Sequence, residues 1–219
     1  MSTPYLVSEL PETALVVIDV QQAFIDPSFL KRERSTPNLQ PNITTLLAGF
    51  RAKHLPVIHI HHIDTGKFDP EGRSLWNEKT HPEGVLPQDY VTPLAGEPVL
   101  RKYDQSSAFG AHLVSDRTTS LKDVLDSQGI KTVVLVGQSS PHCVSSTARS
   151  AFDLGLSVVV VGDACATYAA GIPEFPGVAK GDIKEGKGWS AELVHGIAMA
   201  HLDGDIADVV GTPEVLKFL

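Results

Sequence analysis

Cysteine is scarce in this chain, because only two of its 219 residues, Cys143 and Cys165, carry a thiol. Two cysteines at this separation do not have the spacing of a structural zinc site. Both lie beside regular apolar runs, which is typical of proteins in a reducing compartment. The first residues, Met1 to Tyr5, lack the basic and then apolar segments of a secretory signal. The sequence therefore predicts a cytoplasmic protein.

Positive charge is also scarce. The chain has 18 Lys and Arg residues against 26 Asp and Glu, which gives a formal net charge of −8, and the basic residues are scattered. Binding to a phosphate backbone needs a clustered basic face, so we expect no nucleic-acid partner. No apolar run is long enough to cross a bilayer, so we expect no membrane partner. The composition does not mark a domain boundary, and a chain of this length can bury one substantial core, so we expect residues 1–219 to form a single domain.

Short apolar runs alternate with helix-like segments along the chain. The runs are mostly continuous Val, Ile and Leu, which is typical of strands buried on both faces. Strands and helices that alternate in this way predict a mainly parallel sheet, roughly six-stranded, in a three-layer α/β/α sandwich. The expected strands are Ala14 to Val20, Pro56 to Ile60, Pro98 to Leu100, Thr132 to Val136, Leu156 to Val161 and Ala207 to Val210, and the expected helices are Asn42 to Lys53, Leu113 to Gln128, Val144 to Leu154 and Ala191 to Leu202.

Ligands bind such sheets outside the carboxyl ends of the strands, so the residues that follow each run are candidate site residues. Cys143 follows the fourth run, after a turn at Gly137, with Ser140 as expected helix N-cap and Pro141 at the first helical position. Unpaired N–H groups at a helix N-terminus favour a thiolate and can hold an oxyanion. A structural role for Cys143 is the alternative, and Cys165 between two alanines is predicted to be a core residue.

Asp19 and Lys102 follow the first and third runs. Asp19 ends its strand in a largely apolar setting, where a carboxylate can act as a proton acceptor, and the alternative is that it caps a helix starting near Gln21. Lys102 could supply a fixed positive charge next to the thiol, although most lysines are solvated. Two long loops, Thr65 to Tyr90 and Ala169 to Gly188, have the length of binding loops or lids.

Taken together, these segments resemble the isochorismatase-like cysteine hydrolase family. The resemblance runs from about Ala14 to Val210, and its motifs are Ala14 to Phe24, Val99 to Phe109, Gly137 to Arg149 and Gly162 to Ala164. It implies a catalytic triad of Asp19, Lys102 and Cys143, and an oxyanion turn at Ser139 and Ser140 with a cis peptide between these two serines. It also implies hydrolysis of small amides or of vinyl ethers of the isochorismate type, without a cofactor, and a homodimer or homotetramer.

The spacing after the lysine departs from the family pattern. Three residues usually separate the lysine from the Ser-Ala-Phe element, whereas four separate Lys102 from Ser107, so strict spacing would place Arg101 in the lysine's position. We favour Lys102, since a bulge can absorb one residue and arginine does not release its proton. The cluster of His59, His61, His62 and Asp64 lacks the metal-binding spacing of nicotinamidase-like relatives, so we expect it to line a pocket and to hold no metal.

The predicted function is therefore hydrolysis of a small amide or related C–N substrate through a thioester on Cys143. A vinyl-ether hydrolase and a non-catalytic or redox-sensing protein of the same fold remain as alternatives. Core packing is the simpler explanation of the apolar residues on the segment Ala191 to Asp203, and self-association is the alternative. The residues predicted to line the substrate pocket are Gln21, Phe24, His61, Trp76, Tyr103, Phe109 and His142.

Overall fold

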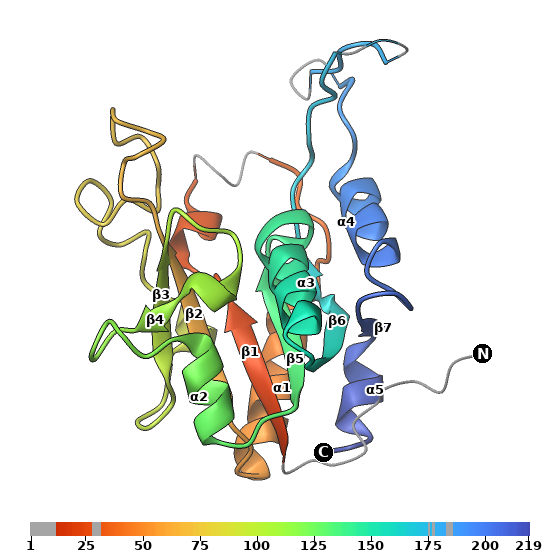
Figure 1. Cartoon of the computed structure of the whole chain (residues 1–219). Helices are drawn as coiled ribbons and strands as arrows, with labels where there is room; N and C mark the ends of the chain where they lie inside the picture. The colour runs from red at the N-terminus through yellow and green to blue at the C-terminus, as the bar shows by residue number, and fades with distance from the viewer. Residues whose placement is uncertain (1–11, 28–31, 175, 177, 183–185) are drawn as a thin grey trace.

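The structure is a computed structural model that describes residues 12–27, 32–174, 176, 178–182 and 186–219 (Figure 1). The prediction that the chain has no secretory signal rests on Met1 to Tyr5, which lie outside these ranges. Parts of the predicted loop Ala169 to Gly188 also lie outside them. Across the described ranges, no helix has both the length and the apolar character needed to cross a membrane.

Seven strands form one sheet in the order β4-β3-β2-β1-β5-β6-β7. All neighbouring pairs are parallel except β4, which is antiparallel to β3, so the prediction of a mainly parallel sheet is confirmed. The sequence prediction missed β4 because two residues are too short to form an apolar run. The strands are β1 (Thr13–Ile18), β2 (Val57–Ile63), β3 (Val99–Tyr103), β4 (His112–Leu113), β5 (Thr132–Gln138), β6 (Ser157–Ala166) and β7 (Asp208–Val210).

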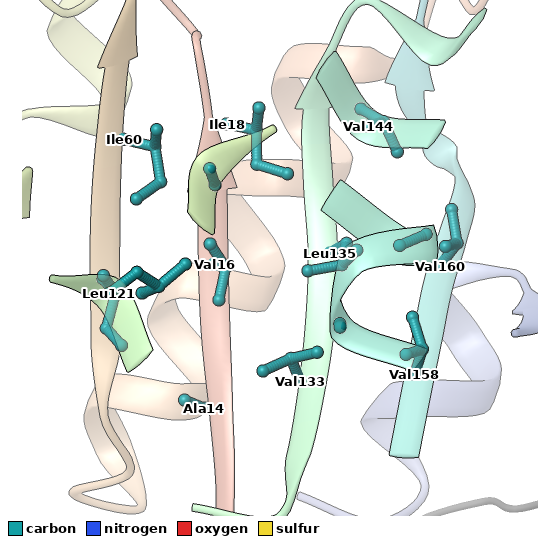
Figure 2. Close-up of a cluster of buried hydrophobic side chains, with 14 of the residues drawn as sticks. Ala14, Val16, Ile18, Ile60, Leu121, Val133, Leu135, Val144, Val158 and Val160 are labelled. Carbon is teal, nitrogen blue, oxygen red and sulfur yellow. The ribbon is translucent and has the colours of Figure 1, made fainter. Parts of the chain in front are cut away.

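Helices cover both faces of the sheet, which gives the predicted three layers. The helices α2 (Leu121–Ser127), α3 (Ser145–Asp153) and α4 (Ala191–Ala200) contribute to the core on one face, and α1 (Leu39–Ala52) and α5 (Thr212–Leu216) to the core on the other. Figure 1 shows α2 and α3 in front of the strands and α1 behind them. Along β1, alternate residues enter the two cores: Val16 and Ile18 pack on the α3 side (Figure 2), and Leu15 and Val17 on the α1 side. Burial on both faces explains why the strands read as continuous apolar runs.

Two helices differ from their predicted bounds. The segment predicted as helix from Leu113 begins only at Leu121, because Ser120 and Asp123 form a reciprocal capping box that fixes the start there. The helix predicted after Ser140 begins with a π-helical turn, Ser140–Val144, before α3 continues it. On α4, Leu193 and Ile197 are 47% and 46% exposed. The structure describes one chain, so the homodimer or homotetramer stays a prediction.

The strand order reverses between β1 and β5, which places the functional segments together. From β1 the chain builds β2 and β3 on one side, and then β5, β6 and β7 on the other. At the carboxyl ends, Ile18 pairs with Gly137, and a Cβ on Gly137 would lie 2.0 Å from the Ile18 carbonyl oxygen. Only glycine permits this approach, which brings Asp19 and the turn that carries Cys143 to one point at the switch in strand order.

Candidate active site

Asp19, Lys102 and Cys143 meet at the carboxyl end of the sheet. Lys102 Nζ lies 2.8 Å from Asp19 Oδ2 and 3.3 Å from Cys143 Sγ, and it also donates to the carbonyl oxygen of Gln105 at 3.0 Å. The side chains of Lys102 and Asp19 are 0% and 2% exposed. A buried lysine paired with a carboxylate and in contact with a thiol is too costly to be incidental, since each charge loses its hydration.

Each of the three side chains is placed by a strand. Asp19 directly follows β1, where its N–H donates to the Ile60 carbonyl oxygen, and its φ of +51° turns the chain out of the sheet. Lys102 lies in β3, opposite His62 of β2. Cys143 lies in the turn that follows β5. The three residues are far apart in the sequence, and neighbouring parallel strands bring them to one edge.

Lys102, and not Arg101, faces the thiol. The two residues point to opposite sides of β3, and Arg101 Nη1 instead pairs with Glu78 at 3.1 Å. The predicted bulge is wrong, because the pairing of β2 with β3 is continuous up to Tyr103. The chain leaves the sheet just after the strand, where Asp104 has a φ of +53° and accepts a hydrogen bond from the Thr65 N–H at 2.9 Å.

The turn ahead of Cys143 differs from the prediction in two ways. The cis peptide joins Gln138 to Ser139 and not Ser139 to Ser140. The N-cap is Ser139, whose extended backbone lets its carbonyl oxygen accept from the N–H groups of His142 and Val144 at 3.1 and 3.2 Å. Ser140 lies inside the turn, is fully buried, and its Oγ lies 2.8 Å from His195 Nδ1 on α4. The end of β5 and the helix α4, which is remote in sequence, thus both fix the position of this turn.

The resting thiol is neutral. Burial and the negative charge of Asp19 raise the pKa of Cys143 to about 12, and the neighbouring Lys102 ammonium offsets this rise only in part. This raised pKa contradicts the sequence prediction of a thiolate, because burial and the Asp19 charge both disfavour a negative sulfur in the resting site. The pKa of Lys102 is raised despite burial, chiefly by Asp19, so the lysine stays an ammonium.

A cavity of about 330 Å³ opens in front of the thiol. Of the residues predicted to line the pocket, Phe24, Trp76 and His142 do so, as does Ser139 of the turn. Phe24 packs against Trp76 edge to face, with ring centroids 4.9 Å apart, and stacks on Tyr168 at 5.8 Å. These rings form an apolar wall that suits a small, flat ligand.

Four predicted pocket residues lie elsewhere. Tyr103 is exposed and lines a separate hollow with Arg101 and His112. Phe109 packs against the core beside α3. His61 is buried on the other side of β2, where burial lowers its pKa to about 4. Gln21 is also buried and hydrogen-bonds to main-chain groups of its neighbours. The prediction of these four residues as pocket lining is wrong. For His61 and Tyr103 the reason is that alternate residues of a strand face opposite sides, whereas Gln21 and Phe109 lie outside the strands and pack into the interior.

Sequence reasoning missed several residues that do line the cavity. His62, which it placed in a histidine cluster, lines it directly, and so do Arg32, Thr167, Tyr168 and Val194. Thr167 and Tyr168 directly follow the carboxyl end of β6, so the rule that sites gather at strand ends would have found them had β6 been given its full length. Arg32 and Val194 carry no comparable sequence signal.

The histidines of β2 take part in separate interactions. His59 Nε2 lies 2.8 Å from Glu97 Oε2, which Arg51 also binds, and His62 Nδ1 lies 3.3 Å from Lys102 Nζ. Within the part of the chain that the structure describes, no three or more His, Cys, Asp or Glu side chains form a group that could hold a metal ion.

The chain matches known proteins over most of its length. A family model of the Isochorismatase domain matches residues 13–173. The uncharacterized isochorismatase family protein YddQ of Bacillus subtilis is 33% identical over 205 residues, which cover 94% of this chain and 99% of that protein. The ureidoacrylate amidohydrolase RutB of Pseudomonas syringae is 31% identical over 194 residues, which cover 75% of this chain and 73% of that protein.

The fold has a counterpart among solved structures. The crystal structure of an isochorismatase-family protein from Chromobacterium violaceum is 29% identical to this chain, with a TM-score of 0.77, and the match covers 99% of this chain and 97% of that one. The family model, the sequence relatives and the shared fold lead to one conclusion: this chain belongs to the isochorismatase family of hydrolases.

Proposed function

We propose that this protein is a cysteine-dependent hydrolase that cleaves a small amide, or a related C–N substrate, through a thioester on Cys143. The observation that carries the proposal is the contact of a buried ammonium with both a thiol and a carboxylate, at the floor of a cavity of small-molecule size. The similarity to an amidohydrolase supports an amide as the substrate. No cofactor is needed for this chemistry, because the three side chains supply nucleophile, base and cation.

In the first half of the reaction, the Asp19 carboxylate takes the thiol proton as Cys143 Sγ attacks the carbonyl carbon. The neutral resting thiol makes this transfer necessary, and Lys102 stabilises the sulfur through its N–H contact as negative charge develops there. The carbonyl π electrons move to oxygen, where backbone N–H groups near Ser140 and Cys143 stabilise the oxyanion. Collapse of the tetrahedral intermediate breaks the C–N bond, and the leaving nitrogen takes the proton from Asp19.

In the second half, water hydrolyses the thioester. Asp19 is again a carboxylate, so it takes a proton from the attacking water as the new C–O bond forms. The C–S bond then breaks, the sulfur recovers the proton held by Asp19, and the acid product leaves. Asp19 thus acts as base, acid, base and acid in turn, while Lys102 keeps its proton throughout.

Two alternative functions differ in the use of the thiol. A vinyl-ether hydrolase of the isochorismate type needs an acid to protonate the substrate and does not need the sulfur. A non-catalytic or redox-sensing protein needs no proton acceptor beside the sulfur. The Lys102 contact to Cys143 favours the amide reaction, because that contact stabilises a negative sulfur. We also propose a cytoplasmic location, since both cysteines are free thiols.

The decisive experiment measures ammonia released from a panel of small primary amides by the wild type and by Cys143→Ala. We expect the variant to lose at least about 1000-fold in turnover, because the covalent path is closed, and Cys165→Ala to keep wild-type turnover. Pyruvate release from isochorismate is assayed in parallel. Pyruvate formed equally by wild type and Cys143→Ala, without ammonia from any amide, would instead establish the vinyl-ether reaction.

A further inference from the structure

His62 is held in place by the side chain of Gln21. Gln21 Nε2 donates to the His62 carbonyl oxygen at 3.0 Å and to the Val85 carbonyl oxygen at 3.0 Å, which uses both of its hydrogens. Gln21 Oε1 accepts from the His62 N–H at 2.9 Å. Gln21 is itself fully buried, and its main-chain carbonyl oxygen accepts a hydrogen bond from Gln88 Nε2 at 2.9 Å. One buried amide thus fixes both main-chain groups of His62, at the point where β2 reaches the cavity.

Lys102 fixes the tautomer of the His62 ring. Lys102 Nζ lies 3.3 Å from His62 Nδ1, and an ammonium can only donate hydrogen bonds. A proton on Nδ1 would point at this positive charge, so Nδ1 presents its lone pair and the ring proton lies on Nε2. Burial, and then the charge of Lys102, lower the pKa of His62, so the ring is neutral at pH 7. The result is an imidazole that is an acceptor toward the triad and a donor at its other nitrogen.

The donor nitrogen has no acceptor among the described residues, although the ring lines the cavity. The interactions of His62 are its main-chain bonds and the Nδ1 contact with Lys102. Phe24 and Trp76, which line the same cavity, offer no acceptor atom in their rings. Arg32 also lines this cavity, with its guanidinium carbon 5.7 Å from the centroid of the Tyr168 ring. The His62 Nε2–H and the Arg32 guanidinium can only donate, whereas the hydroxyl groups of Ser139 and Thr167 can donate or accept, so an oxygen acceptor finds donors here.

We propose that His62 is a substrate-recognition residue, whose Nε2–H binds a keto or carboxylate oxygen carried by the amide beyond its scissile carbonyl, and that Gln21 is the residue that positions it. This inference rests on the proposed amidase function and narrows its substrates to small amides with a second oxygen acceptor. Three amides of similar length separate the possibilities: succinamate carries a carboxylate, 4-oxopentanamide a ketone, and pentanamide neither.

Binding to the Cys143→Ala protein tests the proposal without turnover. By isothermal titration calorimetry we expect 4-oxopentanamide to bind about tenfold more tightly than pentanamide, the value of one hydrogen bond, and succinamate more tightly still because its oxygen is charged. In the Cys143→Ala protein, a second substitution His62→Phe should remove the preference for the two amides with a second oxygen over pentanamide. His62→Gln should keep most of this preference, since a glutamine amide nitrogen can occupy the position of Nε2. The matched controls are His201→Phe and His201→Gln, because His201 is exposed and lies outside this cavity.

Equal binding of the three amides, binding of none, or a preference that survives His62→Phe would overturn the assignment. A second measurement uses the unmodified chain: ¹⁵N-edited NMR of the histidine rings should show His62 protonated at Nε2, and protonation at Nδ1 would also overturn it. Gln21→Met should lower the preference between amides, whereas a purely structural role would lower only the melting temperature. A chain that binds with the expected preference and releases no ammonia contradicts the proposed function and leaves the role of His62 intact.

Discussion

The two cysteines of this protein both have a raised pKa, but their surroundings differ. Burial raises the pKa of both Cys143 and Cys165 to about 12. Cys165 lies in β6, is fully buried, and its Sγ lies 3.8 Å from the carbonyl oxygen of Leu135 within the α3-side core. Cys143 lines a cavity, next to Lys102 and Asp19. The comparison shows that a low resting pKa is not what distinguishes the candidate nucleophile: a proton acceptor, a cation and access for a ligand are.

Of the changes that leave both thiols in place and test the difference between them, removing the cation beside Cys143 is expected to affect both turnover and stability. Lys102→Met should lower amide turnover at least about 100-fold, because no group then stabilises the developing thiolate. It should also destabilise the fold by about 3 kcal/mol, since Asp19 loses its partner in a buried site. The measurements are ammonia release and the free energy of unfolding in urea.

Arg101→Met is the matched control for that variant. Arg101 and Glu78 are 29% and 45% exposed, so their ion pair is worth about 1 kcal/mol or less, and turnover should be unchanged. A loss of turnover in Arg101→Met that equals the loss in Lys102→Met would show that the chain uses the arginine as the family spacing suggested.

A smaller, roughly tenfold effect is expected on the alkylation rate of Cys143 when the Asp19 carboxylate is removed, and it is an increase although turnover is lost. The Asp19 charge raises the pKa of Cys143, so Asp19→Asn should lower that pKa and increase the thiolate fraction at pH 8. We expect iodoacetamide to alkylate Cys143 about tenfold faster in Asp19→Asn, the effect of one pKa unit, although the variant turns over no amide. Mass spectrometry of the labelled peptides separates Cys143 from Cys165.

In the wild type, alkylation of Cys143 should be slow at pH 6 and rise steadily toward alkaline pH. Fast labelling of the wild type at pH 6, with a slower reaction in Asp19→Asn, would mean that the resting sulfur is already a thiolate and that Asp19 does not raise its pKa.

The smallest effect concerns Cys165. Cys165→Ser should cost about 1–3 kcal/mol of unfolding free energy, because the hydroxyl is placed in an apolar core, and it should leave turnover per folded molecule unchanged. Urea unfolding and ammonia release measure the two properties. Loss of turnover in a folded Cys165→Ser protein would remove the distinction between the two thiols.

Local patterns in the sequence predicted most of the central strands and two of the candidate site residues. Continuous apolar runs identified β1, β5 and β6, because strands buried on both faces need apolar residues at most positions, and Val57, Ile58 and Ile60 identified β2 although histidines interrupt it. Asp19 and Cys143 were placed at strand ends by the same reasoning. The start of α2 was predicted too early, since the capping box at Ser120 is a more local signal than the apolar period.

The chain by itself determined which residue types follow each strand, because apolar runs and turn residues are local properties. Only the tertiary structure decided which of them share the site. The register of β2 against β3 pairs His62 with Lys102 and His61 with Arg101. The first pair faces the thiol, and the second pair lies on the opposite side of the sheet. A sequence shows that side chains alternate between the two faces along each strand. It does not show which face lines the cavity, because that depends on how the strands pair. The protonation state of Cys143 was decided in the same way, by burial and by a carboxylate 124 positions earlier in the chain.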